Sequence, residues 1–260
     1  MPEVLEIELY RRAILPVVGR TIRAVDAPDA WYLKRGLTAA ELEHELPGER
    51  ISAARRRGKL LLLDLSGGHV LGLRFGMTGR PLLDESAAPF DLEYSTRRSD
   101  PNWIRFGLDF DGGGRLAIED PRRLGGVELD PPEEAIGPDA FGISRDELDR
   151  ALESRSAVKV VLLDQARIGG LGNMLADELL FRVGIDPARP AVSLSAAERD
   201  ALHDSLGPML GELLERGGSH AGNLAVDLRM RGARCPIDGT ELSRRTIGGR
   251  TTFSCPLHQR

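Results

Sequence analysis

The sequence predicts an α+β protein of more than one domain: an N-terminal helix plus an antiparallel β-sandwich, a helical domain, and a C-terminal zinc-finger-like β-hairpin. At 260 residues the chain exceeds the usual single-domain size, and its 41% hydrophobic content is enough for a buried core. The spacing of apolar residues changes near residue 131 from short runs to helical periodicity. The two cysteines, Cys235 and Cys255, both lie near the C-terminus.

The first element is a helix over residues 3–16. Pro2 suits the first position of a helix, because it lacks the N–H that the first turn cannot use and its φ is fixed. Glu3 and Glu6 are three residues apart and therefore share one face. Removal of Met1 would leave the Pro2 nitrogen as a secondary amine, and the positive end of the helix would favour its unprotonated, nucleophilic form. The alternative is a chain that simply starts with an acidic helical turn.

The next segment is rich in strand patterns. Residues 19–32 predict one or two strands, and residues 37–41 predict a short capped helix. Apolar runs at 59–65, 69–75, 104–110 and 115–119 are separated by turns such as 111–114, at the spacing of hairpins. The polar segment 85–102 predicts a surface loop. Residues 1–131 therefore read as an antiparallel sandwich, the N-terminal catalytic domain in our interpretation.

A linker at residues 130–134, marked by two prolines, precedes a helical domain at 132–220. The pattern from Ser144 to Glu147 is a capping signature, and further helices are expected at 158–165, from Asn173 to Gly184, and at 195–215. The glycine-rich turn 169–172 stands just before one of these helices, whose N-terminus could hold a backbone phosphate. The alternative is an ordinary turn with Asn173 as the helix cap.

Residues 221–260 form a third, finger-like module. Cys235 and Asp238, then Cys255 and His258, are two pairs at i and i+3 across a gap of hairpin length, which is the spacing of a zinc ribbon. We expect a structural zinc ion held by these four side chains, although aspartate is an uncommon ligand in closed structural sites. The alternative is a hairpin with two free thiols and no metal.

The net charge of −5 is unfavourable for nucleic-acid binding when taken as an average, but cations cluster at 55–59 and in the tail. Only three lysines occur, Lys34, Lys59 and Lys159, so most of the 35 basic residues are arginine. A lysine that is kept can have a role that arginine cannot copy. The sequence has no apolar run of transmembrane length and no signal-peptide pattern, so we expect a cytoplasmic protein that does not bind membranes.

Several motifs in one order along the chain resemble the formamidopyrimidine-DNA glycosylase and endonuclease VIII family of bifunctional base-excision repair enzymes. The resemblance extends over the whole chain. It rests on Pro2-Glu3 with Glu6, Arg56-Arg57-Gly58-Lys59, Gly76-Met77-Thr78-Gly79, Asp120-Pro121-Arg122-Arg123, Asp164-Gln165 through Gly172-Asn173 to Glu178, and the tail with Gly248-Gly249-Arg250.

The resemblance implies a DNA glycosylase with AP lyase activity. The Pro2 amine would attack C1′ of a damaged or abasic nucleotide and form a Schiff base, and β,δ-elimination would follow. Glu3 would transfer protons and Glu6 would orient the terminus. Lys59, Asn173 and Arg250 would bind phosphates around the lesion.

Three further residues, Met77, Arg122 and Leu124, would fill the space left by the flipped nucleotide, according to the same resemblance. The implied partner is damaged double-stranded DNA, bound by a monomer in the bacterial cytoplasm and on the nucleoid. The implied cofactor is the structural zinc ion.

The chain departs from the family pattern at several points. Leu124 replaces the aromatic wedge of the formamidopyrimidine branch, Arg74 stands where histidine is frequent, and Asp238 and His258 replace two finger cysteines. The segment from Gly218 to Arg234 is shorter than the one that carries the loop over a flipped 8-oxoguanine, which favours oxidised pyrimidines, formamidopyrimidines, abasic sites or a bulky lesion.

These departures keep two alternatives open. One is a catalytically impaired paralogue that binds damaged or structurally altered DNA. The other is an N-terminal-proline enzyme acting on small molecules.

Overall fold

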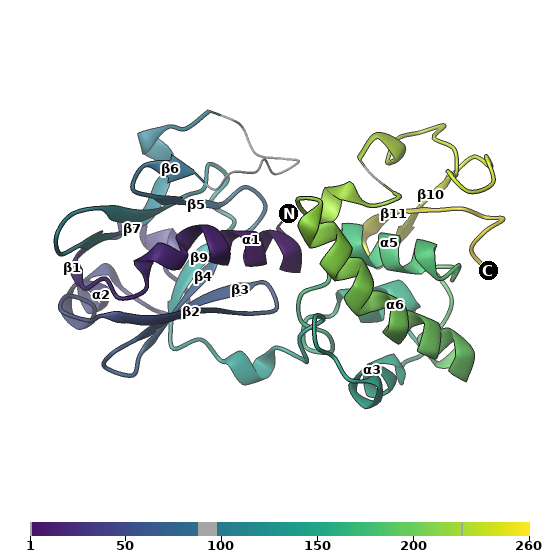
Figure 1. Ribbon diagram of the computed structural model, residues 1–260, viewed down its shortest axis with the longest axis horizontal. Helices are drawn as coiled ribbons and strands as arrows, with labels where there is room; N and C mark the ends of the chain where they lie inside the picture. The colour runs from purple at the N-terminus through teal and green to yellow at the C-terminus, as the bar shows by residue number, and fades with distance from the viewer. Residues whose placement is uncertain (1, 88–97, 225) are drawn as a thin grey trace. The chain divides into compact units, whose positions relative to one another are not determined.

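The computed structural model describes residues 2–87, 98–224 and 226–260. Two compact units account for them: Pro2 with Glu6–Glu133, and Glu3–Leu5 with Glu134–Arg260 (Figure 1). The break after Glu133 falls within the predicted linker. The division into domains 1–131, 132–220 and 221–260 stays a prediction.

The first unit contains two antiparallel sheets, as predicted. One has the order β1-β7-β8-β5-β6 and the other the order β2-β3-β4-β9. Their strands are β1 Ile22–Asp26, β2 Ile51–Arg57, β3 Leu60–Leu65, β4 Val70–Arg74, β5 Arg80–Leu83, β6 Ser86–Ala87, β7 Ile104–Phe110, β8 Arg115–Glu119 and β9 Gly126–Leu129.

The four apolar runs are confirmed as β3, β4, β7 and β8. Residues 19–32 hold a single strand, β1, followed by the 3₁₀ helix η2 (Ala30–Tyr32). The predicted loop 85–102 is only partly described, because residues 88–97 lie outside the described part of the chain. Its described ends contain β6 and the 3₁₀ helix η3 (Pro101–Trp103), so the segment is not wholly irregular.

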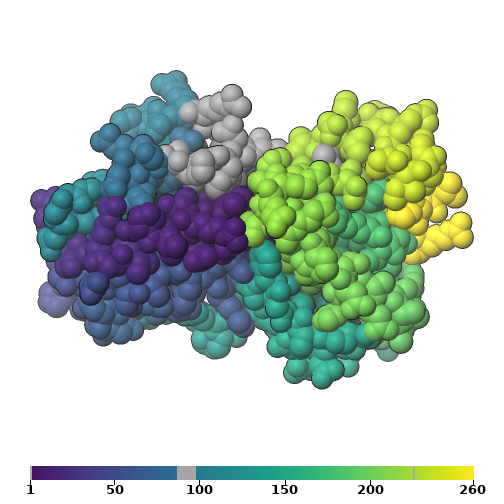
Figure 2. Space-filling view, in the orientation of Figure 1, coloured from purple at the N-terminus to yellow at the C-terminus, as the bar shows by residue number. Residues whose placement is uncertain are grey.

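Helix α1 (Val4–Ile14) contributes an apolar stripe to the core of the first unit. Ile7, Tyr10 and Ile14 recur at helical spacing and are buried with the inward residues of both sheets. The Tyr10 and Phe75 ring centroids are 4.7 Å apart. The helix gives way to the 3₁₀ turn η1 (Leu15–Val17), where Pro16 cannot continue the α-helical bonding. Figure 2 shows the outer side of α1, in purple, at the surface of this unit.

A second, shorter helix of this unit, α2 (Ala39–Glu45), was predicted from its cap. The Thr38 hydroxyl accepts the Glu41 amide, as the capping pattern requires.

The second unit is helical with one terminal hairpin. Its α-helices are α3 Arg145–Leu152, α4 Val158–Leu163, α5 Asn173–Arg182 and α6 Ala196–Glu215, and strands β10 (Ser243–Ile247) and β11 (Arg250–Ser254) form the hairpin. Short 3₁₀ helices connect them: η4 Glu133–Ala135, η5 Ala191–Ser193, η6 Ser219–Ala221 and η7 Val226–Leu228. Strand β11 packs on α5. No helix in the described ranges is both long and apolar enough to cross a membrane.

The helix starts follow from local chemistry. The predicted capping box at Ser144 and Glu147 is confirmed, and a second box at Ser195 and Glu198 begins α6. Helix α5 differs, because its N-cap is Gly172, which has no side chain to satisfy the first amides. The cap of α5 is therefore supplied from elsewhere in the chain.

Candidate catalytic site and nucleic-acid interface

Glu3 supplies the missing cap of α5. Its side chain is 2% exposed, and its two oxygens accept three amides: Gly172 at 2.9 Å, Met174 at 2.9 Å and Leu175 at 3.1 Å. A Cβ at Gly172 would collide with the Glu3 carboxyl group, so a larger residue there would have to displace the carboxylate from the helix start. The carboxylate is thus held at the positive end of a helix by charge-assisted hydrogen bonds.

This contact corrects one expectation from the sequence. Asn173 is the first residue of α5 and not its cap, because a glutamate far away in the sequence takes the capping role. The same carboxylate occupies three of the amides that could have held a phosphate. These three amides are therefore not available to a phosphate, and phosphate binding by Asn173 stays a prediction.

The glycine-rich turn before α5 is held by Gln165 and by the start of the chain. Gln165 Nε2 donates to the carbonyl of Leu171 at 2.9 Å, and its Oε1 accepts the Gly170 amide at 3.0 Å. The Val4 amide donates to the Gly170 carbonyl at 3.0 Å. Gln165, which in the sequence is only one member of a motif, therefore holds the shape of the turn.

The remaining residues predicted for catalysis belong to the first unit. Pro2 is buried, and Glu6 is 4% exposed. Lys59 is half-buried and follows Gly58, whose φ of 55° allows the tight turn between β2 and β3. Met1 lies outside the described residues, so its removal stays a prediction.

Two neighbouring turns of the first unit bring Met77, Arg122 and Leu124 together. The buried Asp120 carboxylate joins the turns, because it accepts the Thr78 hydroxyl at 2.7 Å and the Gly125 amide at 2.9 Å. A Cβ at Gly76 would collide with the Leu124 backbone, which shows how closely the turns approach. Arg122 is exposed, Leu124 is 51% exposed and Met77 is half-buried, so all three predicted contact residues are at least partly accessible.

Arg123 fixes the conformation of the second turn. Its φ is 55°, which is unusual for a residue other than glycine. Its guanidinium forms two hydrogen bonds with Asp29, at 2.7 and 2.6 Å. Burial alone would raise the pKa of Asp29, but the hydrogen bonds and charge of Arg123 outweigh it and lower that pKa below its ordinary value.

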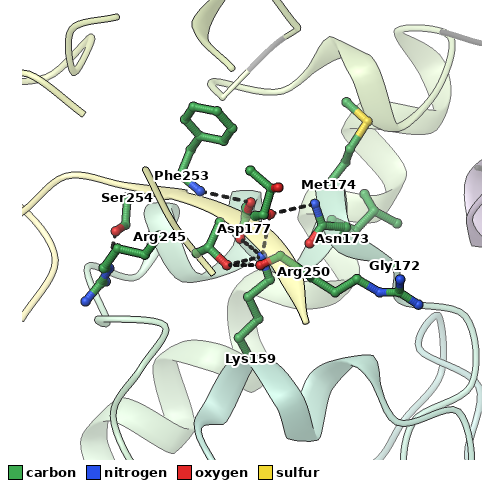
Figure 3. Close-up of polar contacts among 12 residues, drawn as sticks. Lys159, Gly172, Asn173, Met174, Asp177, Arg245, Arg250, Phe253 and Ser254 are labelled. Atoms are coloured by element: carbon green, nitrogen blue, oxygen red, sulfur yellow. Dashed lines mark hydrogen bonds and ion pairs between the residues drawn. The ribbon is translucent and has the colours of Figure 1, made fainter. Parts of the chain in front are cut away.

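A buried charged cluster in the second unit links α4, α5 and β11 (Figure 3). Lys159 Nζ lies 2.6 Å from Asp177 Oδ1, and Arg229 lies 2.7 Å from Asp177 Oδ2. Lys159 also donates to the Thr252 hydroxyl at 2.7 Å. Lys159 and Asp177 are completely buried, and this burial lowers the pKa of Lys159, although the Asp177 charge opposes the shift.

Strand β11 also meets the two residues predicted to bind phosphate in this unit: Arg250 is its first residue, and Asn173 on α5 contacts it. Asn173 Nδ2 donates to the Thr251 carbonyl at 3.0 Å. Arg250 follows the turn Gly248-Gly249, where both φ angles are positive, at 56° and 73°. Figure 3 shows the Arg250 side chain extending away from the Lys159–Asp177 pair. Within the described residues its guanidinium has no hydrogen bond or ion pair, so it is available to an anion.

The finger brings three of the four predicted metal ligands together. One donor atom each from Cys235, Asp238 and Cys255 lies within 4.8 Å of the others. Such a triangle fits three corners of a tetrahedral zinc site. Burial raises the pKa of the Cys255 thiol, which donates to Asp238 Oδ2 at 3.2 Å. The donor set therefore fits a zinc ion, with two sulfurs and one oxygen.

The His258 ring is not among those three donors. Its Nε2 lies 2.7 Å from the Phe181 carbonyl, which can only accept, so Nε2 carries the proton and Nδ1 is the basic nitrogen. A metal-binding histidine commonly has this arrangement of its two nitrogens. His258 as the fourth ligand stays a prediction.

The order of modules and the geometry above agree with comparisons to known proteins. The family model described as the formamidopyrimidine-DNA glycosylase N-terminal domain matches residues 1–127, and the H2TH domain model of the same family matches residues 135–223. A formamidopyrimidine-DNA glycosylase of Cereibacter sphaeroides is 33% identical over 290 residues, with 100% of both chains covered. One from Exiguobacterium is 32% identical over 282 residues, with 98% of both covered.

Solved structures give the same result. The Lactococcus lactis Fpg in complex with abasic-site DNA matches with a TM-score of 0.82 and 26% identity, over 99% of both chains. The same enzyme with DNA containing Fapy-dG matches with a TM-score of 0.82 and 25% identity, over 99% of this chain and 100% of that one. The chain belongs to the formamidopyrimidine-DNA glycosylase family.

Proposed function

We propose that the protein is a base-excision repair DNA glycosylase with AP lyase activity, which acts as a cytoplasmic monomer on oxidised, ring-opened or abasic nucleotides in duplex DNA. One observation carries the proposal: the carboxylate of Glu3, the residue after Pro2, is buried and held by three amides of one helix start. A carboxylate that is held by three hydrogen bonds suits a group that must transfer protons from a fixed position. Membership of the formamidopyrimidine-DNA glycosylase family and the DNA-bound structures of relatives also support a DNA repair function.

In the proposed reaction the Pro2 nitrogen attacks C1′ of the damaged nucleotide. The C1′–N bond to the base breaks, and the base leaves with a proton taken up from solvent. The sugar ring then opens between C1′ and O4′ as an iminium forms between Pro2 and C1′. This cation is an electron sink. Loss of a C2′ proton therefore expels the 3′-phosphate by breaking the C3′–O bond (β-elimination), and loss of a C4′ proton then expels the 5′-phosphate by breaking the C5′–O bond (δ-elimination), with both protons passing to solvent.

Glu3 handles the protons in this scheme. It accepts the proton that the Pro2 nitrogen loses on attack and delivers it to O4′ as the ring opens. The three amides stabilise its ionised form, which prepares it to act first as a base. Glu6 is a positioning residue for the terminus, and Lys59 contacts the phosphate beside the reacting sugar.

The chain as a whole is acidic, so DNA binding depends on a few individual side chains and not on the net charge of the protein. Lys59, Asn173 and Arg250 bind phosphates and set the register of the duplex, while Arg122 and Leu124, with Met77, fill the space of the flipped nucleotide. The exposure of Arg250 and Leu124 supports these assignments. Binding should weaken steeply with salt.

A zinc ion in the finger would be held by Cys235, Asp238 and Cys255, with His258 as the proposed fourth ligand. When bound, the zinc ion would cross-link the C-terminal segment and would take no part in the reaction with DNA. The hairpin that bears Arg250 belongs to the same C-terminal segment, so the ion would stabilise the part of the chain that presents this arginine.

The proposal is tested on duplexes that contain an abasic site, a formamidopyrimidine or an oxidised pyrimidine. Wild type should cut the lesion strand and leave phosphates at both new ends, and Pro2→Gly and Glu3→Gln should abolish cutting while leaving DNA binding within a few-fold. Salt-sensitive binding without cleavage would favour the catalytically impaired paralogue, an alternative motivated by Asp238 and His258 in the finger and by the short segment from Gly218 to Arg234. Failure to bind duplex DNA at low salt would instead revive an enzyme acting on small molecules.

A further inference from the structure

Trp31 is an exposed aromatic residue that the proposed chemistry does not use. Its side chain is 69% exposed, the highest fraction among the large hydrophobic residues in the described ranges, and it is the only aromatic residue among those that are exposed. A single exposed apolar residue needs no explanation by itself. The position of Trp31 in the fold, beside proposed DNA-contact residues, indicates a role in binding.

Trp31 lies on η2 beside the turn that carries Arg122 and Leu124. One oxygen of Asp29 accepts both the Trp31 amide, at 3.1 Å, and the Arg123 guanidinium, at 2.6 Å. The chain after η2 continues along β9, because the Lys34 amide donates to the Val127 carbonyl at 2.9 Å. The tryptophan is therefore anchored to the same turn as the proposed DNA contacts.

One cation lies over the ring, and two more lie at the neighbouring Asp29. Lys34 Nζ is 5.2 Å from the ring centroid and also donates to the Trp31 carbonyl at 2.7 Å. The nearby carboxylate of Asp29 is neutralised by Arg123, and Arg105 approaches it to 3.8 Å. An exposed aromatic ring with a cation beside it is a combination that binds nucleic-acid strands, since bases stack on the ring and phosphates contact the cation.

We propose that Trp31 is a further DNA-contact residue, whose ring stacks on a base exposed beside the flipped nucleotide. It would supply the aromatic contact that the aliphatic Leu124 on the adjoining turn cannot supply. The inference rests on the proposed function, because it requires a duplex opened at a lesion. It adds a contact from η2, a segment outside the turn that carries Arg122 and Leu124.

Tryptophan fluorescence tests the proposal, because the chain has only two tryptophans, Trp31 and the half-buried Trp103. In the Trp103→Phe variant all tryptophan emission comes from Trp31. Acrylamide quenching is measured with and without a saturating abasic-site duplex, and binding is followed separately by the anisotropy of a label on the DNA. We expect the quenching constant to fall at least about twofold on binding.

A pair of variants tests the energetic contribution. Trp31→Ala should weaken binding of the abasic-site duplex by about five- to a hundredfold, the range for loss of one base–aromatic stack. Leu15→Ala removes another exposed apolar side chain of the same unit, 47% exposed, and should change binding less than about twofold. Equal melting temperatures would exclude misfolding as the cause.

The outcomes separate the two proposals. Binding with unchanged Trp31 quenching, or equal affinities for Trp31→Ala and wild type, would overturn the inference alone. Absence of DNA binding by wild type would overturn the proposed function and the inference with it.

Discussion

The buried cluster around Asp177 allows a quantitative prediction, because one carboxylate serves two cations. Asp177 pairs with Lys159 at 2.6 Å and with Arg229 at 2.7 Å, and both members of the first pair are completely buried. Asp177→Asn keeps the shape of the side chain but leaves two buried cations without a counter-charge. Removing one partner from a buried ion pair costs about 3–5 kcal/mol, so we expect a loss of that size in the free energy of unfolding.

Lys159→Met should cost less, although it breaks the same pair. Asp177 would keep Arg229 and the Phe253 amide at 3.4 Å, so no buried charge would lose all of its partners. The losses are the ion pair with Asp177, which is offset in part because a buried charge is also removed, and the hydrogen bonds to the Thr252 hydroxyl and the Thr251 carbonyl. The two hydrogen bonds correspond to about 1–3 kcal/mol, and we expect a total cost of that size. The expected order of stability is wild type, then Lys159→Met, then Asp177→Asn.

Urea denaturation followed by circular dichroism at 222 nm measures these differences, because the helical signal comes largely from the second unit. Asp204→Asn is a matched control: it removes an acid that is 78% exposed, on α6 of the same unit, and should change stability by less than about 0.5 kcal/mol. A cost for Lys159→Met equal to or above that of Asp177→Asn would refute the reasoning.

Three further predictions concern the cap, the core and the finger. Glu3→Gln should lower stability by about 1–2 kcal/mol, because a neutral acceptor replaces the charge at the α5 start; an unchanged thermal melt would contradict the capping role. Burial raises the pKa of Tyr10 and Tyr32 in the folded protein. Their contribution to stability is therefore complete below about pH 10, the pKa of an unfolded tyrosine. Above that pH each tyrosine loses at most about 1.4 kcal/mol of stability per pH unit. Urea midpoints between pH 8 and 11 should therefore fall less steeply in Tyr32→Phe, and an equal slope would contradict this. Titration with Co²⁺ should give one equivalent with a thiolate charge-transfer band, which Cys255→Ser removes; no band in wild type would indicate a finger without metal.

Much of the fold could be predicted from local patterns. The apolar runs of β3, β4, β7 and β8 and the capping box at Ser144 depend on residues close in sequence, and the structure confirms them. Strand β2 was not predicted, because Arg55-Arg56-Arg57 reads as a charged patch. In the fold Arg55 pairs with Asp64 at 2.8 Å and with Glu133, so the arginines belong to a strand with partners on neighbouring segments.

The candidate site depends more on distant pairs, which local patterns do not contain. Glu3 and Gly172 are 169 positions apart, and the only local signal was a helix start without a capping side chain. The cluster at Lys159 had a signal that sequence reasoning did not use: a lone lysine inside an apolar helix, in a chain that otherwise prefers arginine. Its partner Asp177 lies on another helix, so only the tertiary structure identifies the pair.

The central claim is that the Pro2 nitrogen is the nucleophile, and borohydride trapping followed by peptide mass spectrometry tests it most directly. Wild-type protein reduced in the presence of abasic-site DNA should give a covalent complex in good yield. The DNA remnant should map to a terminal peptide that begins at Pro2, and Pro2→Gly should reduce the yield sharply. Retention of Met1 on all of the trapped protein, or an adduct found on Lys59 instead, would contradict the account.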